Sequence, residues 1–476
     1  MTALIAATLG GMLLGVGQKM LVAPLIGAAA GLILLMMPLN SMLTLLLAVT
    51  FVLAGTLTFF GKVSFIAWLP YSLAGFLYLY FLVRVIETHG AGRAAVHPLF
   101  AWLGMYVIVV VLSSLYMGIP PMQWVAIGKN YFAFWSVLLI MAFLPVKPST
   151  IEQLWKALIL VALVQLPVAL YQYFIVGGSR IESGAGEAWD VVVGTFGGTE
   201  EGGGQSAAMG FFQVMMVVFA LVLWRRALVS RSLLFLVLAV AAATIYLAEV
   251  KAMLLLMPLA FLIVYRRDLL RRPRELVIGS ALILGFMGVM PMAYNALHYE
   301  REGRRAMTTS EFVDSLVSQT DRHVINRATG QMGRITQLDF WAQRNARDLS
   351  FEGLFGHGIG STKISRLYIG DAARRYYPLP LGNTSASVML WEVGVVGLVF
   401  FVGLLLAGSR LASRLATDCE IPAVHRAILE TSAIGLLLVV LTLPYKHYAI
   451  QLSSIQMLIV LMLGQAAYWY SRTRTR

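Results

Sequence analysis

Long apolar runs separated by short polar connections dominate the pattern of this chain. A helix needs about 20 mostly apolar residues to cross a bilayer, and in lipid each segment must satisfy its own backbone hydrogen bonds. We therefore interpret these runs as membrane-spanning helices. The pattern predicts about fourteen spans, at residues 2–17, 20–38, 41–60, 63–86, 98–118, 122–144, 154–176, 205–224, 232–248, 251–265, 275–294, 386–408, 427–446 and 449–470.

One polar stretch is far longer than the other connections and divides the chain into three parts. Residues 1–294 hold predicted helices 1–11, residues 295–385 form the long loop, and residues 386–476 hold helices 12–14. The predicted fold class is therefore all-α, a polytopic transmembrane helix bundle with one large, partly helical periplasmic loop. We expect the chemistry of the protein to be found at that loop.

Composition supports the membrane class. Of the 476 residues, 59% are hydrophobic and 12% are charged, which excludes a soluble globular protein. The N-terminal run lacks a basic region and a clear cleavage site, so we expect residues 2–17 to be retained as the first span. The single cysteine, Cys419, falls in a predicted cytoplasmic loop, and no disulfide framework is expected to hold the outer loops.

The distribution of basic residues predicts the orientation. With a cytoplasmic N-terminus, eighteen Lys and Arg residues fall in cytoplasmic connections and six fall in short outer connections or nearby helix ends. This bias follows the positive-inside rule. We therefore expect a multi-pass protein of the bacterial inner membrane with both termini in the cytoplasm and residues 295–385 outside.

Two predicted outer loops differ in character. In the 295–385 loop, twelve basic and nine acidic residues give a net charge of 12 − 9 = +3. Apolar residues at helical spacing predict two amphipathic helices within 310–349, with a break at 330–333. The loop at 177–204 is rich in glycine and has a net charge of 1 − 5 = −4. Its glycines fit either close approach of a ligand or a linker.

Three charged residues within or between predicted spans need an explanation. Because a charge at the bilayer centre is costly, we expect Glu249 and Lys251 to lie in a hairpin at the outer edge, where they can pair. Glu392 lies within the predicted span 386–408. It fits equally a packed structural carboxylate and a functional one.

The C-terminal part carries a set of motifs in a recognisable order. The segment GRITQLDFWAQRNARDLSFEGLFGHGIGS is followed by NTSASVMLWEVGVVGLVFF, while GTFGG and EVKAMLLL occur earlier in the chain. This order resembles the C-terminal signature of the bacterial O-antigen polymerase and ligase superfamily. The resemblance covers about residues 190 to 405.

The resemblance implies a GT-C-like, inverting glycosyltransferase that uses an undecaprenyl-diphosphate-linked oligosaccharide and needs neither a metal nor a cofactor. Arg334 takes the place of the family's loop arginine, and Lys251 stands where the family usually has arginine. Asn383 and Glu392 match the Asn and Glu that open a transmembrane helix. The chain departs from the family at Gly382, where a histidine often stands, and near Gln205, where an asparagine is usual.

The residue types themselves suggest roles in such a transfer. Positive charge must lie where charge grows on the departing diphosphate, and arginine can hold phosphate oxygens in bidentate geometry. Arg334 and Lys251 are the leading candidates, with Arg180 and Arg301 behind them as substrate-binding residues.

The acceptor hydroxyl needs a proton acceptor. His357, in the glycine turn GHGIG, is the first candidate for this base. Glu392 or a carboxylate of the 295–385 loop competes with it, and His323 and His447 are secondary candidates.

Several functions stay open at this stage. We favour a polymerase of lipid-linked repeat units for O-antigen, capsule or exopolysaccharide, working with a flippase and a chain-length regulator in the bilayer and without nucleic acid. An O-antigen ligase or protein O-oligosaccharyltransferase would differ only in its acceptor. A polysaccharide or lipid transporter is an alternative from another class, although the halves show no convincing repeat. A noncatalytic scaffold of a secretion complex is a further one.

Overall fold

The structure is a computed structural model and describes a defined part of the chain. It is mostly helical, at 77%, which confirms the all-α class in its coarse form. The described residues are 31–87, 98–271, 331–345, 350–365 and 367–474, with the single positions 292, 295, 308, 311, 325 and 326.

The helices fit a membrane protein. Among the described residues, seven helices are long and apolar enough to cross a membrane, and a pair bent by 43° makes eight if it counts as one span. The predicted span 2–17 lies outside the described residues, as does all of 275–294 except position 292. Much of the predicted span 20–38 also lies outside them. The number fourteen and the GT-C-like architecture therefore stay predictions.

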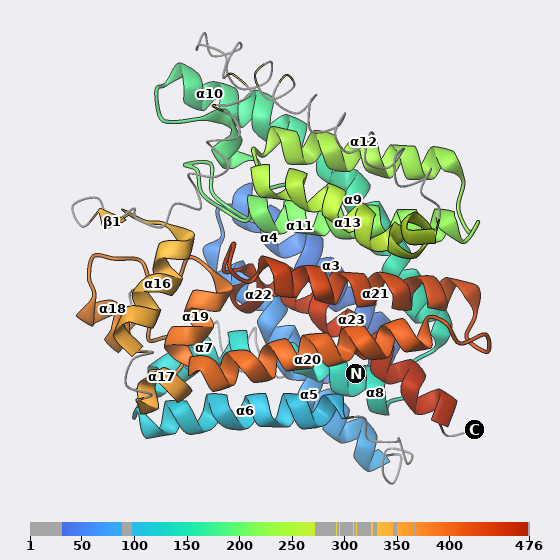
Figure 1. Ribbon diagram of the computed structural model, residues 1–476, viewed down its shortest axis with the longest axis horizontal. Helices are drawn as coiled ribbons and strands as arrows, with labels where there is room; N and C mark the ends of the chain where they lie inside the picture. The colour runs from blue at the N-terminus through green and yellow to red at the C-terminus, as the bar shows by residue number, and fades with distance from the viewer. Residues whose placement is uncertain are drawn as a thin grey trace, which may run out of the picture.

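In Figure 1 the elements of the N-terminal half run from α6 at the lower edge of the bundle to α10 at its upper left. The bent pair is α7 and α8, and a single long rod of α9, η3 and α10 follows it. In chain order these elements are α3 (Leu39–Ala48), η1 (Val49–Leu53), α4 (Ala54–Phe59), η2 (Ser64–Trp68), α5 (Leu69–Glu87), α6 (Leu99–Tyr116), α7 (Pro121–Phe132), α8 (Trp135–Phe143), α9 (Pro148–Tyr171), η3 (Gln172–Val176), α10 (Gly177–Glu182) and η4 (Ala188–Val191).

The remaining elements complete the bundle and build the long loop. They are α11 (Ser206–Arg225), α12 (Arg231–Leu247), α13 (Lys251–Arg271), β1 (Ile325–Asn326), β2 (Gln331–Met332), α16 (Arg334–Asn345), α17 (Phe351–Phe355), α18 (Asp371–Arg375), α19 (Ser385–Glu392), α20 (Gly394–Leu415), α21 (Ala423–Thr442), α22 (Tyr448–Gln451) and α23 (Ser453–Arg474).

Helix α11 lies at the centre of the bundle. Its apolar window is 94% buried, and it packs against α9, α12, α13 and α21. Helix α20 packs against α6, α21 and α23. A helix that is hydrophobic on all sides belongs in a core, and the uniform apolar sequence of α11 explains its central position.

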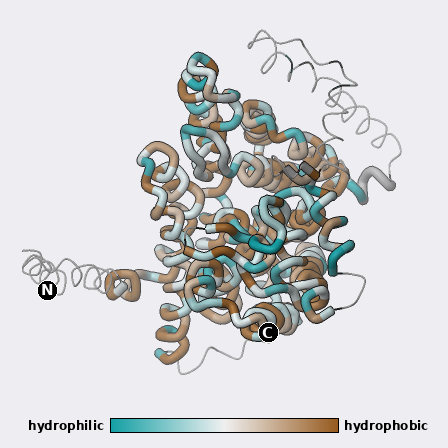
Figure 2. Tube along the Cα trace, turned by 90° about the vertical axis from the view of Figure 1, so that its left-hand side faces the viewer, coloured by the Kyte–Doolittle hydropathy of each residue, from teal (hydrophilic) through white to brown (hydrophobic). Residues whose placement is uncertain are grey.

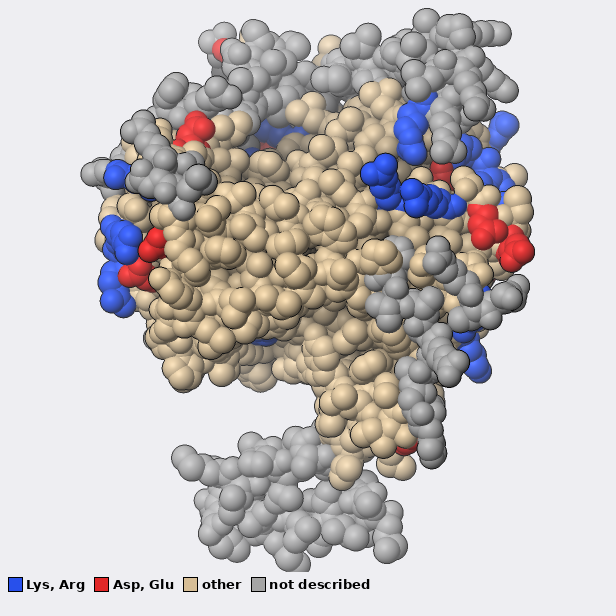
Figure 3. Space-filling view, turned by 60° about the horizontal axis from the view of Figure 1, so that its bottom comes forward, with Lys and Arg blue, Asp and Glu red and all other residues tan. Residues whose placement is uncertain are grey.

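The bundle has two unlike ends. Helices α10, α16, α17 and α18 lie at the left end in Figure 1, here called the loop end. Figure 2 looks onto this end, where hydrophilic segments lie among hydrophobic helix ends. On the face in Figure 3, most visible charged side chains of the described residues gather toward the two ends, with a broad uncharged band between them. Such a band is typical of the surface that faces lipid.

The predicted span 386–408 is not one helix. It is divided into α19 and α20 at Val393 and Gly394. Gly394 has a φ of +69°, and a Cβ atom there would lie 2.2 Å from the carbonyl oxygen of Leu354. The close approach of the loop backbone therefore breaks the helix, and Glu392 becomes the last residue of α19.

The long loop is helical only in part of its described residues. Helix α16 confirms the helix expected in the second half of 310–349. At 325–326 and 331–332, where we expected a helix and a break, an antiparallel pair of strands joins Ile325 to Met332. Most of 310–330 lies outside the described residues.

The break between α19 and α20 can be tested with one substitution. Gly394→Ala should lower the free energy of unfolding by about 1–3 kcal/mol, because alanine is strained at positive φ. The collision of its methyl group with the Leu354 carbonyl should lower it further. Gly104→Ala in α6 is the control, since a Cβ there has nothing within 4 Å and the change should be neutral or slightly stabilising. Equal unfolding temperatures of both variants in detergent would contradict this reading of the break.

Candidate functional site

Two buried glutamines hold the glycine-rich loop at the loop end. The side-chain oxygen of Gln172 accepts hydrogen bonds from the backbone N–H groups of Val193 (3.0 Å) and Gly194 (2.7 Å). The oxygen of Gln165 accepts one from the N–H of Thr195 at 2.8 Å. Because buried polar groups need partners, these amides fix the start of the GTFGG segment against η3 and α9.

Thr195 links the same segment to η1 by a hydrogen bond. Its hydroxyl donates to the carbonyl oxygen of Phe51 at 2.5 Å and accepts from Nε2 of Gln165 at 2.8 Å. The backbone then runs so close to Gly55 that a Cβ atom at residue 55 would lie 2.0 Å from the Thr195 carbonyl oxygen. Here the sequence requires glycine to allow two backbones to meet.

A pocket of about 320 Å³ opens beside this segment. Its wall combines backbone of the glycine-rich loop with side chains of α4, α5 and α7. Nζ of Lys129 lies 4.1 Å from the centroid of the Trp68 ring and 4.6 Å from that of Tyr71, so the ammonium group is held by aromatic faces. The polar lining residues include Thr58, Lys129, Thr199, Gln205, Gln451 and Ser453.

More cations adjoin the pocket. Lys363 donates a hydrogen bond to the side-chain oxygen of Gln451, a lining residue, and its charge acts on Lys129. The charge of Lys363 also acts on His447, as does that of Lys446. Arg334 belongs to the same group of neighbouring basic residues, because its charge acts on Lys446. We call Lys129, Lys363, Lys446, Arg334 and His447 the basic cluster.

The ionisation of the cluster reflects first its burial and then the charges of its neighbours. Burial lowers the pKa of Lys363. Burial and the charge of Arg334 lower the pKa of Lys446. Burial and the charges of Lys446 and Lys363 lower the pKa of His447 to about 4, so that its ring is neutral near pH 7. A bound anion would relieve the repulsion among these groups.

Arg334 begins α16, and its guanidinium group lies over an aromatic ring. Its guanidinium carbon is 4.1 Å from the centroid of the Tyr445 ring. Gln337, one turn later, accepts a hydrogen bond from the backbone N–H of Asn383 at 3.2 Å. Asn383 therefore lies beside α16, and the two predicted residues Arg334 and Asn383 are brought to one region.

Glu392 is a buried hub, with only 1% of its surface exposed. Its carboxylate accepts hydrogen bonds from the Tyr131 hydroxyl (2.7 Å), the Gly360 N–H (2.7 Å) and the Thr362 hydroxyl (2.5 Å). These bonds join α7, α19 and the glycine turn. Of the two roles left open by the sequence, the geometry favours a residue that positions Gly360 and Thr362, and with them Lys363, the next residue.

His357 lies in the same turn, apart from the pocket. Its backbone N–H donates to the carbonyl oxygen of Trp391 at 2.8 Å, and its ring stacks on the Trp391 ring with centroids 5.6 Å apart. Burial, and next the charge of Arg375, lower the pKa of His357. Its Nε2 is buried without a hydrogen-bond partner among the described residues. The ring is thus neutral near pH 7 and can accept a proton.

Glu249 and Lys251 form the predicted hairpin between α12 and α13. Nζ of Lys251 lies 3.2 Å from a carboxylate oxygen of Glu249, and both side chains are largely buried. Glu249 has a φ of +52°, which marks the turn. The expected pairing is confirmed, and Lys251 is engaged with this partner.

The remaining candidates have other surroundings. Arg180 is buried and donates to the carbonyl oxygens of Glu200 (3.0 Å) and Ala185 (3.2 Å), so its guanidinium braces the glycine-rich loop. Arg301 lies outside the described residues. None of the six described candidates, Arg180, Lys251, Arg334, His357, Asn383 and Glu392, lines the pocket.

Sequence reasoning did not select Lys129, Lys363 or Lys446 as site residues. A signal existed for Lys129, because it is the one basic residue of the predicted span 122–144. Gln165 and Gln172 likewise stand out as amides in the predicted span 154–176. An intramembrane polar residue indicates either a function or a buried partner.

Comparison with known proteins adds no relative: no protein-family model matches the chain, and a search of curated proteins found no match.

The crowding of the cluster predicts a pH dependence. An unfolded histidine has a pKa of about 6.5, whereas folded His447 has one of about 4. Between these values the unfolded chain binds the extra proton, so the free energy of unfolding should fall by about 3 kcal/mol as the pH drops from about 6.5 to about 4. Unfolding temperatures in detergent measured across this range should fall less for His447→Gln. An identical pH profile of the two proteins would refute the assignment.

Proposed function

We propose that this protein is a polymerase of lipid-linked glycans, which transfers an undecaprenyl-diphosphate-linked chain onto an acceptor glycan at the loop end of the membrane bundle. The observation that carries the proposal is the pocket between the glycine-rich loop and Lys129, bordered by the basic cluster. The resemblance of the sequence motifs to the O-antigen polymerase and ligase superfamily supplies the reaction class.

The donor's diphosphate explains the need for several cations. In the transfer, an acceptor hydroxyl oxygen attacks the anomeric carbon, and the bond from this carbon to the diphosphate oxygen breaks with its electron pair left on the phosphate. The ammonium groups of Lys129 and Lys363 are compact charges, and the planar guanidinium group of Arg334 can donate to two phosphate oxygens at once. Fixed charges in a site shielded from water stabilise such a leaving group more than mobile ones do.

The pocket wall suits a phosphate for a second reason. Glycine-rich backbone lets N–H groups approach an anion closely, and the segment is fixed in advance by Gln165 and Gln172. A site that is ordered before substrate arrives has no ordering cost at the moment of reaction. Arg180 supports this role indirectly, since it braces the far part of the same loop.

The hydroxyl proton needs an acceptor. Burial raises the pKa of Glu392, but its carboxylate already accepts three hydrogen bonds from the protein and is therefore poorly placed to accept a proton from a substrate hydroxyl. His357 has a lowered pKa and a buried Nε2 but lies apart from the pocket, so we keep it as the candidate base for an acceptor hydroxyl that is bound outside the pocket. Glu392 is then a positioning residue, because its hydrogen bonds to Gly360 and Thr362 hold the segment 357–363 that carries both His357 and Lys363.

The reaction class follows from a single assay. Purified protein is supplied with lipid-linked repeat units, and products are separated by length. Chain extension supports a polymerase. Transfer to lipid A core or to protein without extension would instead identify a ligase or protein O-oligosaccharyltransferase, and movement of the lipid-linked glycan across vesicles without any new glycosidic bond would overturn the enzyme proposal.

The pocket lysine gives the first prediction from this function. Lys129→Gln should slow chain extension about a hundredfold, because one charge that stabilises the leaving group is lost. The control Lys156→Gln alters a lysine that is 72% exposed on α9 and should extend chains at the wild-type rate. An active Lys129→Gln enzyme would remove the pocket from the mechanism.

Arg334 gives the second prediction. Arg334→Lys keeps the charge but loses the planar fork and the contact with Tyr445, so most polymerisation should be lost while the protein still folds. Arg344→Lys is the matched control on the same helix, since Arg344 is exposed. Normal polymer length in the Arg334→Lys variant, at an unfolding temperature equal to that of wild type, would count against the role of Arg334.

A further inference from the structure

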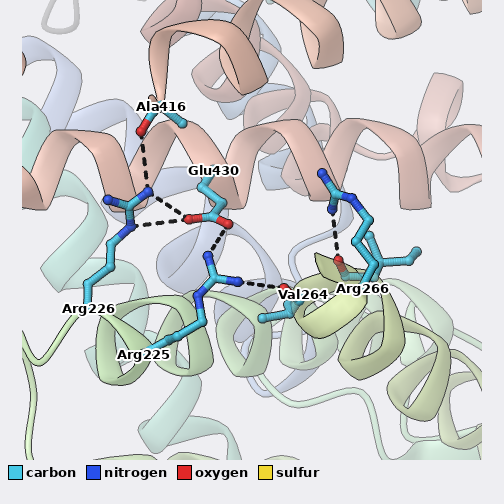
Figure 4. A network of polar contacts seen from close by, with 7 residues as sticks. Arg225, Arg226, Val264, Arg266, Ala416 and Glu430 are labelled. Carbon is cyan, nitrogen blue, oxygen red and sulfur yellow. Dashed lines mark hydrogen bonds and ion pairs between the residues drawn. The ribbon is translucent and has the colours of Figure 1, made fainter. Parts of the chain in front are cut away.

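A second polar pocket lies at the end of the bundle opposite the loop end. It has a volume of about 340 Å³ and is formed where α11, α13, α20 and α21 come together (Figure 4). We call it the arginine pocket. Its polar lining residues are Arg225, Arg226, Arg266, Ser413, Thr417 and Glu430.

Glu430 holds two of the arginines in place. Arg225 donates to one carboxylate oxygen of Glu430, and Arg226 donates to the other from Nη2 at 2.8 Å and from Nε at 3.1 Å. Figure 4 shows both guanidinium groups converging on this carboxylate from α11. These bonds fix the two long side chains before any ligand arrives. Binding a ligand therefore costs less side-chain conformational entropy than it would with mobile arginines.

Backbone oxygens complete the support. Nη1 of Arg225 donates to the Val264 carbonyl oxygen at 2.6 Å, and Nη2 of Arg226 donates to the Ala416 carbonyl oxygen at 3.3 Å. The two arginines thus connect α11 to α13 and to the end of α20. These contacts keep the guanidinium groups at the pocket wall.

The lining carries an excess of positive charge. Three arginines and one glutamate give 3 − 1 = +2. Arg266 is exposed and donates to the carbonyl oxygen of Ile263 at 2.8 Å, while Arg225 and Arg226 are only partly exposed. Partly buried cations attract an anion more strongly than fully solvated ones, because water screens them less.

The pocket also lies at the right depth for a lipid headgroup. The candidate spans Ser206–Arg225 and Gly394–Leu415 end beside it, and Ala423–Thr442 begins there. Side chains at the ends of spans are level with the polar region of a bilayer. Basic pockets between transmembrane helices bind phosphate-bearing headgroups on the side where basic residues collect.

We propose that the arginine pocket binds the phosphate of an anionic glycerophospholipid in the leaflet at this end of the bundle. Arg225 and Arg226 provide ordered donors, and Arg266 adds a charge from α13. The bound phosphate joins helices α11, α13 and α20. Lipid composition therefore tunes the stability of the bundle from the side opposite the candidate glycan site, whatever reaction occurs there.

The test uses the purified full-length chain in nanodiscs. Nanodiscs of phosphatidylcholine alone are compared with nanodiscs in which part of the lipid is phosphatidylglycerol, and the unfolding temperature is measured. We expect phosphatidylglycerol to raise it. Arg266→Gln should weaken the apparent affinity for phosphatidylglycerol about fivefold, which corresponds to about 1 kcal/mol for one basic side chain at a membrane surface.

Arg410→Gln is the matched control, because Arg410 is an exposed arginine of α20 that does not line the pocket. It should keep the wild-type response, and both variants should unfold at the wild-type temperature in phosphatidylcholine. Equal responses of Arg266→Gln and Arg410→Gln would overturn the proposal. An equal rise in phosphatidylcholine nanodiscs with added inorganic phosphate would overturn the lipid as source and leave a free-anion site.

Discussion

The loop end depends on the pairing of polar groups that are buried in an apolar bundle. Glu392 is the clearest case: its carboxylate receives hydrogen bonds from α7 and from two residues of the glycine turn. An unpaired buried carboxylate would cost several kcal/mol, so these elements must assemble together. The position of Lys363, and with it one edge of the pocket, follows from that assembly.

The sequence predicted those features that depend on neighbours along the chain. Apolar runs gave the helices, and the cost of charge in lipid gave the Glu249–Lys251 hairpin. The pocket could not be predicted in this way, because its partners are distant in the sequence: Tyr131 and Glu392 are 261 residues apart, and Lys363 and Gln451 are 88 apart. The break at Gly394 was also missed, since its cause is the backbone of another segment.

The two ends of the bundle treat positive charge differently. At the loop end, the charge of Lys363 acts on Lys129 and the charge of Arg334 acts on Lys446, and burial lowers the pKa values of Lys363 and Lys446. At the opposite end, Glu430 neutralises part of the charge of Arg225 and Arg226 and fixes their geometry. A crowded set of cations stores repulsion that a transient anion can relieve, whereas a braced set suits an anion that stays bound.

The contact between Gly55 and the Thr195 backbone has a consequence for how this protein can change over generations. Two main chains meet there with no side chain between them, so the width of the pocket is set by backbone rather than by a replaceable side chain. Single substitutions at residue 55 cannot adjust it gradually, because even one methyl group forces the loop outward. Changes in ligand preference would have to come instead from lining side chains that hold no other part of the site, such as Thr58, Ala67 and Ser453.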